Sequence, residues 1–189
     1  MSGRNLTIVQ MGGKYKVAQY GQGDGDPEYN GVIVLEFAQK LRVPSFRAEF
    51  ERKLNLVSWI TDEEYKARGI DDDDSSYPEF YKYTESRILD LIMKKEDGLK
   101  LDNQIGFATD TVFCEWVWVI DLDANTFEAY TGNHSERLTD EDRFFFLLKN
   151  DKDAVSAVKL VTKWELNNLP SEGEFMDFFY SEEEYEEDE

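Results

Sequence analysis

Hydrophobic and polar positions alternate in five short segments of the chain. Residues 6–11 and 14–20 are strand-like, and Gly12 and Gly13 between them favour a tight hairpin turn. A second strand pair is predicted at 112–122 and 126–131, and residues 158–166 follow as a last strand. The pattern therefore predicts two hairpins and one single strand.

The run at 112–122 is the strongest of these strands. Simple alternation assigns its even-numbered residues from Cys114 to Leu122 to one face, and Val117 and Val119 to the other. Both faces are apolar in the middle of the run. We therefore expect a central strand that is buried on both sides.

Six segments have hydrophobic residues at helical spacing. They are predicted at 32–41, from Pro44 onward, from Thr61 to Gly69, at 84–95, after Thr139 and after Ser171. Thr61 with Glu64, and Ser171 with Glu174, have the spacing of a capping box at a helix start.

Hairpins and helices are interspersed, without the regular alternation of a parallel sheet. The sequence therefore predicts an α+β fold with a mainly antiparallel sheet of about five strands, two hairpins plus one, covered by helices. Residues 1–180 are expected to form a single globular domain. Residues 181–189 are expected to form an acidic, disordered tail.

Composition adds a large negative charge to this scaffold. The 189 residues include 41 Asp and Glu against 21 Lys and Arg, which gives a formal net charge of −20. Such a field repels bare nucleic acid and anionic membranes and attracts basic protein surfaces. Direct nucleic-acid binding is therefore disfavoured, and a basic, nucleic-acid-binding protein is the expected class of partner.

The cysteine count and the lack of long apolar runs indicate the cellular compartment. The single cysteine, Cys114, excludes an intramolecular disulfide and fits a reducing compartment. The N-terminus lacks the apolar run of a signal peptide, and no stretch approaches the about 18 apolar residues of a membrane span. The sequence predicts a soluble, cytoplasmic protein with no membrane partner.

A glycine-rich loop at 21–27 invites comparison with phosphate-binding loops. Gly21, Gly23 and Gly25 would need a glycine at the sixth position of the dinucleotide fingerprint, where this chain has Asp26. The acids in the loop would also repel phosphate. We expect a wide turn whose glycines adopt positive φ.

Metal-ion and catalytic chemistry find little support. The glycine and glutamate positions of an EF-hand are missing from loops starting at Asp24 or Asp121. One cysteine and one histidine are too few for a zinc site. Cys114 and His134 form the only nucleophile and base combination, and Cys114 is expected to pack beside tryptophans. The sequence predicts no cofactor, no metal site and no enzyme.

The charge itself gives the candidate binding site. Carboxylates on an extended chain repeat every ~3.3 Å, close to the ~3.4 Å phosphate spacing of one DNA strand. Tyr77 and Tyr81 follow an acidic loop and either join a binding surface or fold onto the core. The predicted partner-binding residues are Asp71, Asp72, Asp73, Asp74, Tyr77, Tyr81, Glu182, Glu183, Glu184, Glu186, Glu187, Asp188 and Glu189, with Asp24, Asp26 and Glu28 second.

A resemblance is carried by residues 14–22, by Asp24, Gly25 and Pro27, and by 113–116 running into 119–123. Over about residues 6–179 the chain resembles a group of small acidic proteins from Firmicutes and their phages. One branch of that group resembles the type II-A anti-CRISPRs, phage proteins that inhibit Cas9. This chain departs from the group where an aromatic residue is usual, at Gly23 and Asp26, and no catalytic residue carries over.

Charge and resemblance together predict a function. The expected protein is a phage anti-CRISPR-like inhibitor, a DNA mimic in the host bacterial cytoplasm. It would bind a nucleic-acid-guided nuclease, Cas9 with its guide RNA, through acidic surfaces and block DNA binding or cleavage. Two alternatives stay open: a small carboxylate-dependent hydrolase acting around the glycine loop, and an acidic protein-interaction module with no antiviral role.

Overall fold

The structure, a computed structural model, describes residues 3–150 and 154–186, without the side chains of 150 and 182–186. A five-stranded sheet with the spatial order β2-β1-β5-β6-β7 lies at its centre. Only one pair of neighbours in this sheet, β1 and β5, is parallel. The predicted α+β class with a mainly antiparallel sheet is confirmed. The strands are β1 (Arg4–Met11), β2 (Lys14–Gly21), β5 (Cys114–Asp121), β6 (Thr126–Thr131) and β7 (Lys159–Glu165).

Helices and short turns connect these strands. Two two-residue strands, β3 (Ser58–Trp59) and β4 (Lys100–Leu101), pair in parallel outside the sheet. The helices are α1 (Val32–Lys40), α2 (Pro44–Leu54), α3 (Asp62–Arg68), α4 (Ile88–Lys94), α5 (Phe145–Asn150) and α6 (Glu172–Glu186). The shorter turns are the π-helix η1 (Pro27–Gly31) and the 3₁₀ helices η2 (Glu85–Arg87), η3 (Ile105–Thr109) and η4 (Leu166–Asn168).

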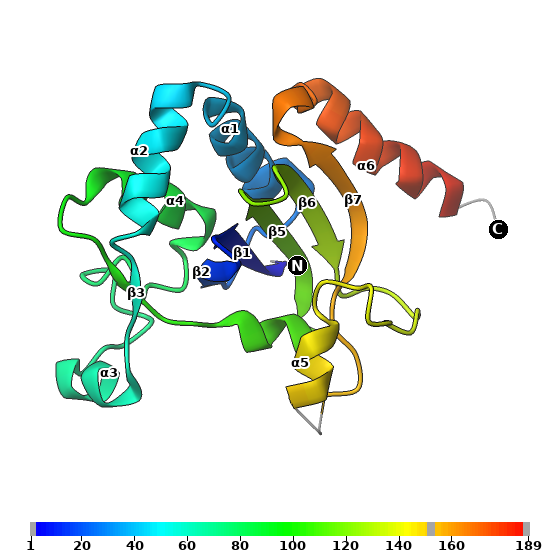
Figure 1. Ribbon diagram of the computed structural model, residues 1–189. Coiled ribbons are helices and arrows are strands. Elements are labelled where there is room, and N and C mark those ends of the chain that lie inside the picture. The colour runs from blue at the N-terminus through cyan, green and yellow to red at the C-terminus, as the bar shows by residue number, and fades with distance from the viewer. Residues whose placement is uncertain (1–2, 151–153, 187–189) are drawn as a thin grey trace.

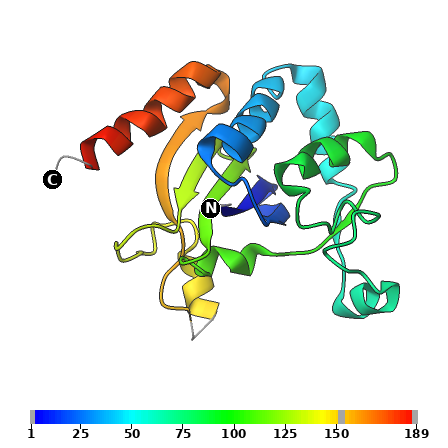
Figure 2. The same cartoon turned by 180° about the vertical axis from the view of Figure 1, so that it is seen from behind.

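The two faces of the sheet carry separate hydrophobic cores. Helices α1, α2, α4 and α6 cover one face, where Trp118 packs with ring centroids 5.9–6.0 Å from those of Phe127, Phe175 and Phe179 (Figure 1). The other face is covered by η3 and α5, which supplies Leu147. Seen from behind, α6 crosses the upper part of the sheet and extends past it (Figure 2). Burial on both faces explains why β5 has a nearly continuous hydrophobic sequence.

A buried ion-pair network lies in the second core. Arg143 donates from Nη2 to Asp121 Oδ2 (2.6 Å) and from Nε to Glu128 Oε2 (3.0 Å). The Tyr130 hydroxyl donates to the same Glu128 oxygen (2.5 Å). Each buried charge therefore has hydrogen-bonding partners, which is the condition for burying ions at tolerable cost.

The two predicted hairpin turns meet at the same end of the sheet. Gly12 and Gly13 have φ of 63° and 69°, the left-handed region that a two-residue hairpin turn requires. Their backbone amides donate to the two carboxylate oxygens of Asp123, at 2.7 and 2.9 Å. Asp123 belongs to the turn between β5 and β6, so one side chain ties both hairpins together.

Two local predictions are wrong. Cys114 packs in the core of the second face with Val117 and Val119, because the register of β5 shifts after Cys114. The helix expected directly after Thr139 begins at Phe145 instead. There the Thr139 amide donates to Asp142 Oδ2 (2.7 Å), which closes a turn before the helix starts.

One residue covers the outer edge of the sheet at β2. The backbone amide of Gln104 donates to the Ala18 carbonyl (3.1 Å), and its side-chain Oε1 accepts from the Tyr20 backbone amide (2.8 Å).

Within the described ranges, no helix is long and apolar enough to cross a membrane. The expected boundary at 180/181 falls inside α6, and the last residues of the expected tail lie outside the described part, so that division stays a prediction.

Candidate functional site

The acidic loop at 71–74 follows α3 and is exposed at all four aspartates. The Asp74 amide donates to the Asp71 carbonyl (3.0 Å), and the Asp73 amide donates to Asp71 Oδ1 (3.0 Å). Aspartate side chains that bond backbone two residues further on order a turn locally. The loop therefore has a defined shape although it lies on the surface.

The carboxylates of this loop converge. One oxygen from each of Asp71, Asp72 and Asp73 lies within 4.8 Å of the others. Lys82 forms an ion pair with Asp73. At Asp74, hydrogen bonds from the side chain and backbone of Ser76 lower the pKa of the carboxyl, so it is ionised at neutral pH. The arrangement is a compact, ordered cluster of negative charge.

The tyrosines beside this loop are divided between core and surface. Phe80 is buried and lies edge-on to Tyr65, with ring centroids 5.7 Å apart. The predicted binding residues Tyr77 and Tyr81 are half-buried, and Tyr83 is exposed. The segment is thus partly folded onto the core, and it keeps aromatic surface next to the acids.

Two of the three predicted acidic segments, the aspartate loop and the glycine loop, are connected through the backbone of Lys82. Its backbone amide donates to the Asp72 carbonyl (3.0 Å), and its carbonyl accepts from the Gln22 amide (2.9 Å) in the glycine loop. The loop carrying Asp24 is therefore a direct neighbour of the segment that carries the aspartate cluster.

Part of the predicted tail continues α6. The backbone of Glu182, Glu183, Glu184 and Glu186 belongs to α6, and their side chains lie outside the described part of the structure. Glu187, Asp188 and Glu189 lie outside the described residues altogether. Their predicted contribution to partner binding stays a prediction.

The expectation of positive φ is wrong for the three glycines of the loop, and two of them, Gly21 and Gly25, are needed for space instead. Gly21, Gly23 and Gly25 all have ordinary φ, and the positive φ of 49° belongs to Asp24. A Cβ on Gly25 would lie 2.6 Å from the Gly3 carbonyl oxygen. The loop passes so close to β1 that no larger residue fits without a shift.

A buried carboxylate fixes this loop. Glu85 accepts hydrogen bonds from the Gly23 amide (2.9 Å) and from Asn30 Nδ2 (2.9 Å). Asn30 Nδ2 also donates to the Asp24 carbonyl (2.8 Å). Burial raises the pKa of Glu85. The loop amide that a phosphate ligand would need at Gly23 is thus already occupied by a carboxylate.

Asp26 has a different environment from the other two acids of the loop. Asp24 and Glu28 are exposed, and Glu28 accepts a hydrogen bond from the Tyr180 hydroxyl (2.8 Å). Asp26 is half-buried. Its pKa is raised mainly by this burial and, to a smaller extent, by the negative charge of Glu28. A hydrogen bond from the Trp116 side chain acts in the opposite direction.

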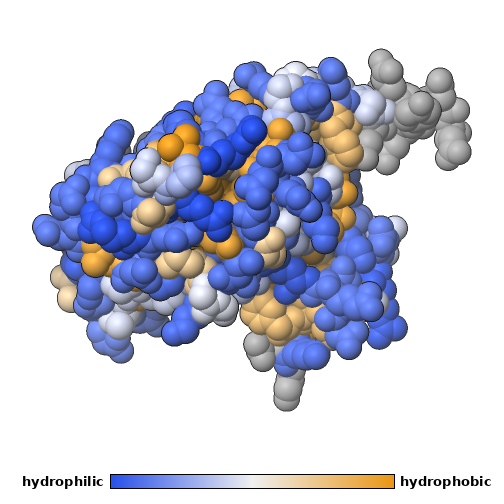
Figure 3. Space-filling model, turned by 45° about the horizontal axis from the view of Figure 1, so that its top comes forward, coloured by the Kyte–Doolittle hydropathy of each residue, from blue (hydrophilic) through white to orange (hydrophobic). Residues whose placement is uncertain are grey.

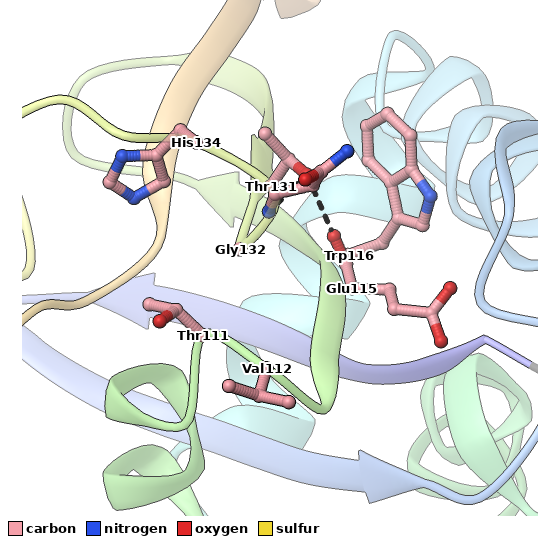
Figure 4. A pocket seen from close by; sticks show the side chains of 8 residues that line it. Thr111, Val112, Glu115, Trp116, Thr131, Gly132 and His134 are labelled. Carbon is pink, nitrogen blue, oxygen red and sulfur yellow. Dashed lines mark hydrogen bonds between the residues drawn. The ribbon is translucent and has the colours of Figure 1, made fainter.

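A bulge in β5 brings a second carboxylate to Asp26. Arg4 pairs with Cys114 and Asn5 with Trp116, so Glu115 is an extra residue without a partner in β1. The bulge breaks the alternation, and the side chains of Glu115 and Trp116 point to the same side (Figure 4). Glu115 Oε2 and Asp26 Oδ1 come within 3.2 and 3.3 Å of the position that a Cβ on Gly3 would occupy. We call Asp26, Glu115 and Trp116 the acid–indole site.

A hollow of about 540 Å³ opens beside the acid–indole site. Glu115 and Trp116 line one side, and His134 lines the opposite side (Figure 4). Thr111, Val112, Thr131, Gly132 and Asn133 complete the lining.

Cys114 and His134 have separate partners. The thiol is fully buried, burial raises its pKa far above the ordinary value, and it donates a weak hydrogen bond to the Trp116 carbonyl (3.9 Å). His134 Nε2 lies 2.9 Å from the Ala157 carbonyl oxygen. A nucleophilic thiol needs a lowered pKa, so this environment opposes catalysis by Cys114. Hydrolysis by the loop carboxylates stays a prediction.

Sequence reasoning found Asp26 and missed both of its neighbours. Strict alternation places Trp116 on a buried face and assigns no role to Glu115, because it hides a bulge. The one available signal was Glu115 itself, a charged residue inside an otherwise hydrophobic strand.

No protein-family model, curated protein or solved structure matches the chain.

Proposed function

We propose that this protein is a non-enzymatic inhibitor that binds a basic, nucleic-acid-binding protein through its acidic surface. The observation that carries the proposal is the aspartate cluster, in which Asp71, Asp72 and Asp73 converge within 4.8 Å on an ordered and exposed turn. Ordered carboxylates lose little entropy on binding and can replace phosphates in a cationic groove.

The surroundings of the cluster support this role. In the described part of the chain, Lys82 is the only base that forms an ion pair with the four aspartates of the loop. The face drawn in Figure 3 is mostly hydrophilic, with hydrophobic residues interspersed among polar ones. An interface built on such a surface depends on charge complementarity more than on one large apolar patch.

The partner class that fits best is a nucleic-acid-guided nuclease, and Cas9 loaded with guide RNA is the member that the resemblance selects. Effectors of this class hold nucleic acid in positively charged channels. An acidic protein seated in such a channel would exclude DNA, or would hold the nuclease away from its cutting arrangement.

The test compares two variants with the same change in charge. The first replaces Asp71, Asp72, Asp73 and Asp74 by Asn. The control replaces the exposed acids Glu36, Asp97, Glu165 and Asp177 by their amides, away from the loop. Affinity for guide-loaded Cas9 is measured across a series of salt concentrations, together with inhibition of DNA cleavage.

We expect the loop variant to bind about tenfold more weakly or worse, with a flatter dependence of affinity on salt, and to inhibit less. The control should retain most of the affinity, because only its long-range contribution to the field is lost. Equal binding and inhibition by the wild-type protein and both variants would exclude the aspartate cluster as the binding surface. Absence of any binding at low salt would exclude the partner.

A further inference from the structure

A cluster of buried polar side chains lies between the glycine loop, β1 and η2. Its members Asn5, Asn30, Glu85 and Ser86 are between 0 and 4 % exposed. No Lys or Arg of the described residues forms an ion pair with Glu85. A buried carboxylate whose hydrogen bonds come only from neutral groups is costly to ionise. Glu85 therefore lacks the compensation that Arg143 gives to the acids of the second core.

An unmet hydrogen-bond acceptor lies in the same cluster. Asn5 Nδ2 donates to the Gly23 carbonyl (3.0 Å), so its Oδ1 is left as an acceptor. That oxygen is buried and has no hydrogen-bond partner in the part of the chain that the structure describes. Turning the amide over would only bring Oδ1 against the Gly23 carbonyl oxygen. The orphaned acceptor therefore calls for a donor.

Asn5 and Glu85 are neighbours across Gly21. A Cβ on Gly21 would lie 2.7 Å from Asn5 Oδ1 and 2.8 Å from Glu85 Cγ, so both side chains close on the same small space. An ionised carboxylate only accepts hydrogen bonds, whereas a protonated carboxyl group has one O–H donor. A proton on Glu85 would thus supply the hydrogen bond that Asn5 lacks.

The backbone holds Glu85 at this place. Its φ of 52° lies in the left-handed region, which a residue with a Cβ rarely adopts. Such conformations persist where the surroundings enforce them, and they are frequent in switch regions. The Gly23 amide donates to Glu85 (2.9 Å), and the carbonyl of the same glycine accepts from Asn5. Gly23 is therefore bonded to both side chains and would respond to a change in either.

We infer that Glu85 is a proton-operated switch of the glycine loop. With a proton bound, its carboxyl group donates to Asn5 Oδ1 and closes a ring of hydrogen bonds through Gly23. When the proton leaves to water, the bond to β1 is lost and two acceptors face each other. The inference does not depend on the proposed function, because it concerns the hold on the loop that carries Asp24 and Glu28, whatever these acids bind.

The charges around Glu85 agree with a switch of this kind. Burial is the main cause that raises the pKa of Glu85, and the negative charge of Asp24 acts in the same direction. The hydrogen bonds from Asn30 and Gly23 and the positive charge of Arg87 lower it. Asp24 and Arg87 are both exposed, so each charge can be removed without opening the core.

The other polar groups on the elements packed around Glu85 have partners of their own. Arg4 of β1 lies over an aromatic ring, and the Tyr20 hydroxyl of β2 donates to Gln22. Lys82, which precedes η2, pairs with Asp73. The buried residues of α1 and α4 are apolar. Asp24 and Arg87 are therefore the charges to change.

The switch is tested by NMR over a range of pH, on protein labelled in its glutamate carboxyl carbons and in its nitrogens. The signals followed are the Glu85 carboxyl carbon, the Asn5 side-chain amide and the Gly23 backbone amide. Glu85→Gln identifies the carboxyl signal. Asp24→Asn is the matched control, because it also removes one carboxylate from this region but keeps Glu85. Arg87→Gln removes the opposing charge.

We expect Glu85 to release its proton at a higher pH than glutamate in a short unstructured peptide, and the signals of Asn5 and Gly23 to change with the same midpoint. This common step should be absent from Glu85→Gln, and it should move to lower pH in Asp24→Asn and to higher pH in Arg87→Gln. Above the midpoint, the protection of the Gly23 amide against hydrogen exchange should fall on the order of tenfold, after correction for the intrinsic rate.

Three results would overturn the inference. The first is release of the proton by Glu85 at or below the pH found for the peptide glutamate. The second is a titration of Glu85 that leaves Asn5 and Gly23 unchanged, since the proton would then not act on the loop. The third is a common step that stays at the same pH in Asp24→Asn and Arg87→Gln. This last comparison decides the assignment even if Glu85→Gln does not fold.

Discussion

Single charged side chains join parts of this fold that are far apart in the sequence. Asp123 accepts hydrogen bonds from the Gly12 and Gly13 amides, which precede it by 111 and 110 positions. These two bonds lower the pKa of the Asp123 carboxyl. A lowered folded-state pKa means that the carboxylate stabilises the fold above the pKa it has in the unfolded chain. That stabilisation is lost as the pH falls through the folded-state pKa.

We therefore expect Asp123→Asn to lower the free energy of unfolding by about 1 kcal/mol at pH 7, a modest value because the carboxylate is exposed. An amide can accept from one glycine but opposes the other with its own N–H groups. Urea unfolding of both proteins is measured from neutral to acidic pH. The two stabilities should converge in acid, and a constant difference down to low pH would contradict the assignment.

Residue-scale prediction from the sequence worked where partners are local. The capping box of Thr61 and Glu64 is present as expected, because both members lie within one helical turn. Arg143 with Asp121 was not foreseen, since 22 positions separate them and only the folded arrangement brings them together. Nothing in local spacing distinguishes such an arginine from a solvated one.

At the scale of elements, the glycine loop depends on how close it passes to β1. A Cβ at Gly25 would lie 2.6 Å from the Gly3 carbonyl oxygen and 2.7 Å from Asn5 Cβ. A Cβ at Gly173, in the first turn of α6, would have no neighbour within 4 Å. Gly25 is thus crowded and Gly173 is not, so the same alanine substitution at the two positions can be compared directly.

Gly25→Ala should reduce the free energy of unfolding by about 2–3 kcal/mol, because backbone atoms must move to admit the methyl group. Gly173→Ala should leave the stability unchanged or raise it by up to about 1 kcal/mol, since alanine favours a helix. Thermal and urea unfolding measure both. Similar results for the two variants would show that the loop has more room than the structure gives it.

Elements were predictable where a repeating pattern runs without interruption. The hairpin of β1 and β2 was found from its apolar segments and turn glycines, although its register shifts between Val9 and Gln10, and β6 was found from the turn that precedes it. The bulge at Glu115 could not be anticipated, because it is a property of how β5 pairs with β1, and that pairing is parallel between strands distant in the chain. The late start of α5 has a similar cause, since the Thr139–Asp142 turn competes with a helix over the same residues.

For the whole molecule, charge opposes the compact state. A net charge of −20 on a folded domain produces self-repulsion that the expanded chain relieves. We expect the free energy of unfolding to rise as sodium chloride is increased from about 10 mM to about 0.3 M, because the screening length shortens. The variant with Asp71–Asp74 changed to Asn should show a smaller rise in the free energy of unfolding over the same range of salt. A fall in stability with salt would mean that favourable ion pairs outweigh the repulsion.

The overall class was within reach of the sequence, and the candidate site was only partly so. Five strands in the predicted places leave few ways to build an α+β sheet. The aspartate cluster is continuous in the chain and was found directly. The acid–indole site joins residues 26 and 115–116 from two segments, and only the folded arrangement shows that they are neighbours.

The burial of Cys114 has a practical consequence. Its thiol is sealed inside the second core, and burial raises its pKa, so little of it is thiolate at neutral pH. We therefore expect maleimide reagents not to modify Cys114. A cysteine introduced at an exposed position could carry a fluorophore or spin label as the sole reactive group, on a chain otherwise left native, for measuring distances to the proposed partner.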